Sequence, residues 1–240
     1  MTEIAFARPS STVVLARAAA GPPEVFMVRR HARSSFGAAY AFPGGVIDPE
    51  DANVDEYCEG RDCDNANATL ALPAGGIAYY VGAIRELFEE TGVLLASCET
   101  SREELDLLRA SLNKESITWL EFLRGTGARM LCDRLTYFSH WITPNAMAKR
   151  YSTRFFAALM PAGQVAEHDA GELTDSVWIS AEKALEAGQH GRMKLHYPTI
   201  KILESVASHE TPGAFLEWAA QCETEGVVAI HPQFPVGARR

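Results

Sequence analysis

Short apolar stretches bounded by turn-forming residues predict β-strands in two parts of the chain. Residues 11–18 (STVVLARA) and 24–31 (EVFMVRRH) are rich in β-branched and aromatic residues, and the Gly-Pro-Pro between them favours a turn. We therefore expect a hairpin that opens a sheet. Residues 129–144, 151–161 and 175–180 have the same strand-like character and predict that the sheet is completed later in the chain.

Segments with apolar residues at helical spacing predict helices between and after these strands. Residues 78–91 end at Gly92, the residue type favoured just past a helix, and residues 101–114 begin with Ser and Glu at capping-box spacing. Further helices are expected at 117–125, 181–189, 197–209 and 212–223. This order predicts one α+β or α/β domain over residues 1–240, with a helical C-terminal extension at about 196–225.

The helix expected at 78–91 carries three carboxylates close together, Glu86, Glu89 and Glu90. At about 100° per residue they span an arc of roughly 100°, and the apolar side chains lie on the opposite side. One interpretation is a solvated acidic edge that Arg85 partly neutralises. Like charges at these spacings repel, however, and acidic residues near a helix C-terminus oppose the macrodipole. A hard divalent cation would remove both penalties, so a metal site is the alternative.

The segment RELFEETGV at 85–93 resembles the second half of the Nudix box, Gly-x5-Glu-x7-Arg-Glu-U-x-Glu-Glu-x-Gly-U, where U is a bulky aliphatic residue. All seven specified positions from Arg85 to Val93 are filled. The first half is similar to FPGGVIDPED, in which Gly45 is followed after five residues by Asp51 in place of the usual Glu. The resemblance to Nudix hydrolases implies an α/β/α sandwich with a mixed β-sheet.

The two halves of this motif lie far apart in the sequence. The 33 residues 52–84 separate Asp51 from Arg85 where the box has seven, so 26 residues, 52–77, are extra. They are acidic and rich in turn-forming residues, and they predict an excursion from the domain, with a lid and a dimer contact as alternative roles. A connection can lengthen without moving the helix that follows it. The split box, with FPGG, KRYSTRFFAA and VWIS, resembles the coenzyme A diphosphatase-like branch over about residues 9–200.

The resemblance implies a role for each residue of the motif. Glu86, Glu89 and Glu90, with the carbonyl group of Gly45 as a further ligand, are expected to bind Mg²⁺ or Mn²⁺. Glu86 and Glu89 are also expected to be catalytic. The residues expected to shape the motif, with the arginine orienting the glutamates, are Gly44, Asp51, Arg85 and Gly92.

The resemblance places the general base either on a box glutamate or on an acidic residue of a later loop. In EHDAGELTDSVWIS at 167–180, Glu172 is the first candidate, with Glu167, His168 and Asp169 as alternatives. A solvated acidic loop without a catalytic role is the structural alternative.

Arginines near the strands are candidates for binding the diphosphate, because the guanidinium group suits bidentate contacts with phosphate. The arginines are Arg29, Arg30, Arg150 and Arg154, and Lys149 is a further candidate. Neighbours in a strand point to opposite faces, so only one of Arg29 and Arg30 can face the site.

Composition and charge narrow the class of partner. A net charge of −9 argues against a general nucleic-acid surface, and the apolar runs are too short to cross a bilayer. The N-terminus lacks the pattern of a secretory signal, and five scattered cysteines favour a reducing cytoplasm over a disulfide framework. We expect a cytoplasmic protein with a small nucleotide-diphosphate substrate and no nucleic-acid or membrane partner. A homodimer stays open, because many Nudix proteins pair.

The leading hypothesis for function is a Mg²⁺- or Mn²⁺-dependent diphosphatase acting on coenzyme A or acyl-coenzyme A. NADH, ADP-ribose, dinucleoside polyphosphates and nucleoside triphosphates are alternative substrates. A non-catalytic nucleotide-binding sensor module with the same fold is the alternative from another class. The complete set of Glu86, Glu89 and Glu90 favours the enzyme hypothesis. The replacement of the usual Glu by Asp51 and the split box leave the sensor hypothesis as an alternative.

Overall fold

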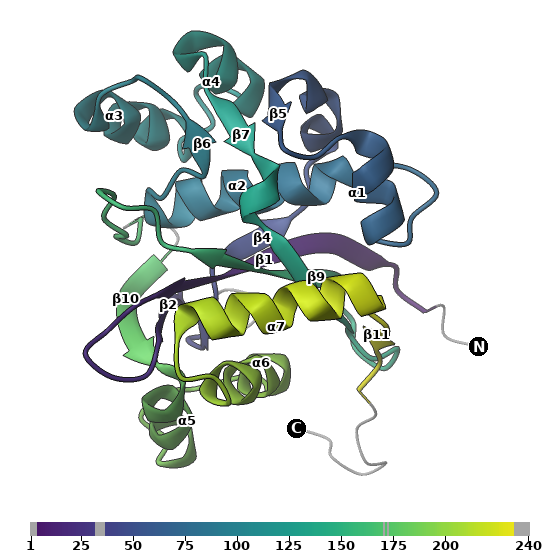
Figure 1. Cartoon of the computed structure of the whole chain (residues 1–240), viewed down its shortest axis with the longest axis vertical. Coiled ribbons are helices and arrows are strands. Elements are labelled where there is room, and N and C mark those ends of the chain that lie inside the picture. Colours follow the sequence, from purple (N-terminus) through teal and green to yellow (C-terminus); the bar gives the residue numbers. More distant parts are fainter. Residues whose placement is uncertain (1–3, 32–36, 170, 172, 233–240) are drawn as a thin grey trace.

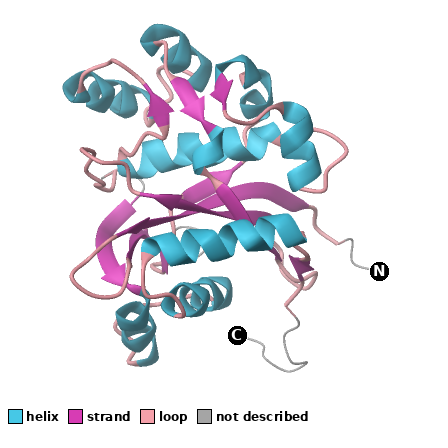
Figure 2. Ribbon diagram, viewed as in Figure 1, coloured by secondary structure: helices cyan, strands magenta, loops and turns pink. Residues whose placement is uncertain are grey.

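A mixed β-sheet lies between two layers of helices in the computed structural model of the chain (Figures 1 and 2). The structure describes residues 4–31, 37–169, 171 and 173–232. The strands follow the order β10-β2-β1-β9-β8-β11, with short β3 beside β2 and β4 beside β1. Their bounds are β1 Ala7–Arg17, β2 Glu24–Arg30, β3 Tyr40–Ala41, β4 Gly44–Val46, β8 Thr136–Ile142, β9 Arg150–Leu159, β10 Leu173–Ser180 and β11 Ala229–Ile230. The predicted α/β/α sandwich is confirmed.

The centre of the sheet is the pair β1 and β9, which run parallel over ten registered positions from Ala7 opposite Arg150 to Ala16 opposite Leu159. Residues 13–16 of β1 are fully buried, because both faces of this strand are covered. The predicted hairpin is confirmed by the antiparallel pairing of β1 and β2, with Ala16 opposite Val25. Central strands covered on both faces are apolar throughout rather than alternating, which explains the run VVLA.

One face of the sheet is covered by α2 (Ile77–Thr91) and the other by α5 (Ala181–Gln189), α6 (Tyr197–Ala207) and α7 (Pro212–Glu225). The alternation of side chains along β9 divides the core accordingly: Phe156 packs on the α2 side and Phe155 on the α5–α7 side. The C-terminal helices that the sequence predicts as an extension are therefore the second layer of the sandwich.

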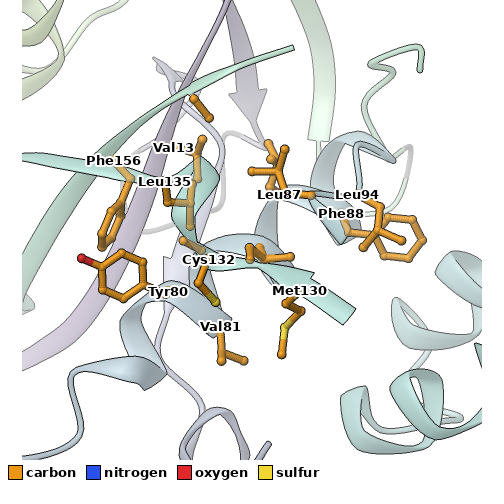
Figure 3. Packing of buried hydrophobic residues seen from close by; sticks show 14 of the residues in the cluster. Val13, Tyr80, Val81, Leu87, Phe88, Leu94, Met130, Cys132, Leu135 and Phe156 are labelled. Atoms are coloured by element: carbon orange, nitrogen blue, oxygen red, sulfur yellow. The ribbon is translucent and has the colours of Figure 1, made fainter. Parts of the chain in front are cut away.

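The core under α2 is dense with aromatic and aliphatic side chains (Figure 3). Tyr80 lies against Phe156 of β9, with ring centroids 4.8 Å apart. Leu87, Phe88 and Leu94 gather at the other end of the helix in the same view. Burial of a large apolar side chain contributes about 1.5–3 kcal/mol, so this face fixes α2 firmly against the sheet.

Residues 52–77 contribute no strand to the large sheet, but several of their side chains are buried in the core. They form short helical turns, η1 (Pro49–Asn53) and η2 (Asp55–Tyr57), then β5 (Cys58–Glu59) and α1 (Cys63–Thr69). Val54, Ala66 and Leu70 are buried in the same apolar cluster as α2. The inserted segment thus folds onto the domain beside the helix that it precedes.

A small second sheet ties the insertion to the middle of the chain. It has the order β5-β7-β6, where β6 is Ala96–Ser97 and β7 is Arg129–Leu131. The helices α3 (Arg102–Leu112) and α4 (Trp119–Thr126) lie between these strands in sequence, as predicted. The single strand expected at 129–144 was wrong in one respect: the turn η3 (Cys132–Arg134) divides it, so β7 pairs in the small sheet and β8 in the large one.

Candidate functional site

The carboxylate helix is buried on almost all sides, which excludes a freely solvated acidic edge. The apolar stripe of α2 is fully covered, and Glu90 retains only 5% of its exposure. The side chains of Glu86 and Glu89 are 18% and 23% exposed. Holding several partly buried carboxylates on one helix is costly unless cations or hydrogen-bond donors compensate them.

Arg85 is the first source of that compensation. Its Nε and Nη2 donate to the two carboxylate oxygens of Asp51 at 2.9 and 3.0 Å. Its Nη1 donates to Glu86 at 3.0 Å and to Glu89 at 3.1 Å. Burial opposes the charge of this guanidinium, but the hydrogen bond to Asp51 and the charges of the three carboxylates outweigh burial and raise the pKa of Arg85.

Asp51 links the two distant halves of the sequence motif. It is fully buried, and besides the two bonds from Arg85 it accepts the backbone N–H of Asp48 at 2.8 Å. Asp48 in turn caps the N-terminus of η1. The loop is therefore folded around the carboxylate of Asp51, which pairs with Arg85 of α2. The 26 inserted residues therefore do not separate the halves of the motif in space.

The glycines of FPGG bring the loop against the other glutamates. The backbone N–H of Gly44 donates to Glu90 Oε2 at 2.9 Å. Gly45 lies directly against the carboxyl group of Glu86, since a Cβ at this position would be 2.3 Å from Glu86 Cδ. A residue with a side chain here would displace the carboxylate of Glu86, so the close contact requires a glycine at this position.

The pKa of Glu89 is shifted upwards by its surroundings. Burial is the main cause, and the charges of Glu86 and Asp51 add to it, while Arg85 acts in the opposite direction; the pKa of Glu89 rises to about 7. Burial and neighbouring carboxylates thus disfavour the charged form of this group.

These groups open onto a cavity of about 400 Å³ between α2, the loop after β4 and the α3–α4 segment. Among the described lining residues, one is positively charged, Arg85, and eight carry a carboxylate group. The eight are Asp48, Glu50, Asp51, Glu86, Glu89, Glu90, Glu115 and Asp169. The opposite wall adds Leu112, Asn113, Ile117, Thr118 and Trp119, with Leu173 of β10. We call this the acidic cavity.

A second cavity of about 460 Å³ lies in the insertion, where Asp55, Cys58, Arg61 and Cys63 are among its lining residues. It contains none of the residues predicted for function. The chemistry predicted from the sequence therefore belongs to the acidic cavity.

The donor set of the acidic cavity fits a hard divalent cation. Its charged donors are carboxylate oxygens, which Mg²⁺ and Mn²⁺ prefer, and the excess of negative charge is what a cation would offset. Within the described part of the chain, no three His, Cys, Asp or Glu side chains already converge as a metal cluster. The three glutamate side chains do not converge because each accepts a hydrogen bond from another group: Glu86 and Glu89 from Arg85, and Glu90 from the backbone N–H of Gly44. Glu86, Glu89 and Glu90 are the residues that could hold the ion.

The later acidic loop reaches the acidic cavity through Asp169. This residue lines the cavity, and its backbone N–H donates to the carbonyl oxygen of Glu90 at 3.0 Å. His168 instead contacts Ser176 through Nδ1 at 2.9 Å. The first candidate for the general base, Glu172, lies outside the described residues.

The arginines predicted for substrate binding are not among the described residues that line the acidic cavity. Arg29 donates to Thr174 Oγ1 at 3.1 Å, and Arg150 donates to the carbonyl oxygens of Ala5 and Thr143. Arg154 is buried over the Tyr79 ring, 4.2 Å from its centroid. The side chain of Arg30 lies outside the described part of the structure.

Sequence reasoning missed the α3–α4 wall of the acidic cavity. Asn113, Glu115, Ile117 and Trp119 follow one another closely in sequence, but no local pattern indicates that this segment faces α2. The capping box of Thr118 and Glu121 was a detectable signal for where α4 begins, not for what it faces.

Comparison with known proteins gives a consistent set of matches. A model of the NUDT19 Nudix domain matches residues 61–204. Nudix hydrolase 7 of Caenorhabditis elegans is 26% identical over 181 residues, which cover 73% of this chain and 53% of that protein. The acyl-coenzyme A diphosphatase NUDT19 of Xenopus laevis is 24% identical over 205 residues, covering 68% of this chain and 54% of that protein. The chain thus spans about half the length of the curated relatives it matches.

A solved structure matches over nearly the whole fold. The NUDIX hydrolase from Alicyclobacillus acidocaldarius superposes with a TM-score of 0.73 at 26% identity, covering 91% of this chain and 97% of that one. Among the helices that the described residues form, none has the length and apolar character needed to span a membrane.

Proposed function

The chain belongs to the Nudix family, and on this premise we propose that it is a divalent-metal-dependent hydrolase that cleaves the diphosphate linkage of a nucleoside diphosphate derivative. The observation that carries this proposal is the bidentate contact of Asp51 with Arg85. It joins the two halves of the split motif and places both beside Glu86 and Glu89. A domain that had lost catalysis would be free to lose this arrangement.

In the proposed mechanism Glu86, Glu89 and Glu90 would hold Mg²⁺ or Mn²⁺, and the carbonyl group of Gly45 would be a further ligand. A bound divalent ion supplies charge neutralisation of the diphosphate and lowers the pKa of a water molecule. Arg85 donates hydrogen bonds to Glu86 and Glu89 and so holds these two side chains in position. Because phosphoryl transfer depends mainly on positioning and charge, little covalent chemistry is required of the protein.

The proton of the attacking water requires an acceptor near the phosphorus atom. Glu89 is the first candidate for this role, because its carboxyl group lines the acidic cavity beside Glu86 and Glu90. Asp169 is the alternative that lines the acidic cavity, and Glu172 remains the alternative from the sequence. Arg29, Arg30, Arg150 and Arg154 stay predictions for contacts with the substrate.

We propose coenzyme A or acyl-coenzyme A as the first substrate to test. The support is the name of the Xenopus laevis relative, an acyl-coenzyme A diphosphatase, together with the resemblance of the split box in this sequence to the coenzyme A diphosphatase-like branch. NADH, ADP-ribose and dinucleoside polyphosphates are the alternatives within the same reaction class. A non-catalytic sensor module is the alternative outside it.

The five cysteines are free thiols, which suits a reducing compartment, and we propose the cytoplasm. A homodimer remains a prediction from the family resemblance.

The test is a hydrolysis assay with Mg²⁺ or Mn²⁺ over coenzyme A, acyl-coenzyme A, NADH, ADP-ribose and a dinucleoside tetraphosphate, with products identified by mass. Wild type is compared with Glu86→Gln, Glu89→Gln and Glu90→Gln, which remove charge and keep shape. Glu182→Gln, an exposed glutamate of α5, is the matched control. We expect hydrolysis by wild type and the control, and a loss of at least about 100-fold in kcat for Glu89→Gln.

Two results would refute the proposal. The first is the absence of hydrolysis of every compound with either metal. The second is hydrolysis that the three glutamine variants support as well as wild type does. Hydrolysis of NADH or ADP-ribose in place of coenzyme A would keep the reaction class and change the substrate.

A further inference from the structure

The C-terminal end of α2 is closed by side chains from α3 that the proposed mechanism does not use. Arg109 donates from Nε to the carbonyl oxygen of Glu89 at 2.9 Å. Asn113 donates from Nδ2 to the same oxygen at 3.1 Å. The last carbonyl groups of a helix have no partner within the helix, so these two donors satisfy an acceptor at the end that carries the carboxylates.

Arg109 also reaches the loop that brings Asp169 to the acidic cavity. Its Nη2 donates to the carbonyl oxygen of Glu167 at 3.0 Å. Two backbone bonds run beside it, from the N–H of Glu167 to Thr91 at 2.9 Å and from the N–H of Asp169 to Glu90 at 3.0 Å. One guanidinium group therefore joins the end of the carboxylate helix to the acidic loop.

The same group supplies a positive charge where α2 has none of its own. The last turn of α2 contains no basic residue, although Glu89 and Glu90 lie at the negative end of the helix dipole. Burial lowers the pKa of Arg109, while the charge of Asp169 opposes this shift. The protein thus keeps a half-buried cation against the carbonyl end of the acidic helix.

Gly92 makes room for this contact. Its φ of +70° is the left-handed conformation that ends α2, and a Cβ there would lie 2.9 Å from Nη1 of Arg109. It would also lie 3.1 Å from Nη2 of Arg102. The motif glycine therefore serves both the helix end and the approach of α3.

We propose that Arg109, assisted by Asn113, is a positioning residue for the acidic cavity, holding the end of α2 and the loop that carries Asp169 as one unit. Its effect on turnover rests on the proposed hydrolysis, whereas its effect on ion binding rests only on the proposed metal site. A residue that only stabilised the fold would change the melting temperature without changing the affinity of the folded protein for a cation.

The experiment measures Mn²⁺ affinity and steady-state kinetics on the full chain, at a temperature well below the melting temperature of each variant. The variants are Arg109→Met and Arg109→Lys, and the matched control is Arg192→Met, an exposed arginine paired with Glu186 on the other face. Removing a group that orients metal ligands typically weakens affinity or activity by about 10- to 100-fold. We expect a loss of about tenfold in Mn²⁺ affinity and in kcat for Arg109→Met, with KM changed by less than about threefold.

The conservative and milder variants separate positioning from folding. Arg109→Lys keeps the charge but lacks the planar guanidinium group whose Nε and Nη2 reach the carbonyl oxygens of Glu89 and Glu167, so it should recover only part of the Mn²⁺ affinity. Asn113→Ala removes one of the two donors to Glu89 from an exposed position, and we expect a loss of a few-fold in Mn²⁺ affinity without unfolding. If Arg109→Met does not fold, Arg109→Lys and Asn113→Ala decide the question.

Wild-type Mn²⁺ affinity in folded Arg109 and Asn113 variants would overturn the proposal. A wild-type protein that hydrolyses nothing, while the variants still weaken Mn²⁺ binding, would refute the proposed function and leave the positioning role standing.

Discussion

The contact between Asp51 and Arg85 gives the sharpest prediction about stability. Asp51 is fully buried, takes two hydrogen bonds from Arg85 and one from the N–H of Asp48. Asp51→Asn keeps the shape but removes the charge and turns one acceptor into a donor that faces another donor. Breaking a buried ion pair by removing one partner costs about 3–5 kcal/mol. Arg85 keeps Glu86 and Glu89, so we expect a loss of about 2–4 kcal/mol.

The free energy of unfolding, measured by urea denaturation, checks this value. Asp64→Asn, which changes an exposed carboxylate of the insertion, is the control and should stay within about 0.5 kcal/mol of wild type. Asp51→Glu restores the usual residue of the family but adds a methylene group to a filled site, and overpacking of this kind costs about 1–3 kcal/mol. If Asp51→Asn is as stable as the control, the two halves of the motif are not held together by this contact.

Three further predictions concern other parts of the structure. Gly45→Ala should lower kcat by about tenfold or more, measured in the hydrolysis assay, because its Cβ would displace the Glu86 carboxyl group. Burial lowers the pKa of His140 to about 4, so protonation favours the unfolded chain and stability falls as pH drops from about 6.5 towards 4. His140→Gln should make that fall shallower by up to about 1.4 kcal/mol per pH unit in denaturation curves. Arg61→Met should lower the free energy of unfolding by about 1–3 kcal/mol, because it leaves the half-buried Glu223 without its 2.8 Å partner.

Most helices and strands, including the helix that carries the glutamates of the candidate site, were predictable from local patterns. Helix α2 has an apolar stripe and a glycine stop, and both signals lie within one segment of the sequence. The strands of the hairpin and the C-terminal helices likewise carry their own periodicity and caps. The family motif groups Asp51 with Arg85, but the hydrogen bonds between them were not predicted, because nothing in the 33 residues that separate them fixes their distance.

The remainder depends on contacts that sequence patterns do not encode. The insertion is polar and turn-rich in sequence, yet Val54, Ala66 and Leu70 are buried in the same apolar cluster as α2 and attach it to the domain. The helix end looked electrostatically unfavourable because its cation, Arg109, comes from the next helix. Such compensation across elements is set by packing, which a single sequence does not reveal.

The central claim is that the divided motif forms one divalent-metal site. Crystals of the wild-type protein grown with Mn²⁺ would test it directly, because anomalous scattering locates manganese independently of the surrounding atoms. The account predicts a peak coordinated by carboxylate oxygens of Glu86, Glu89 and Glu90, beside Gly45, that disappears in Glu89→Gln. A well-ordered acidic cavity without manganese, or manganese bound only elsewhere on the protein, would contradict it.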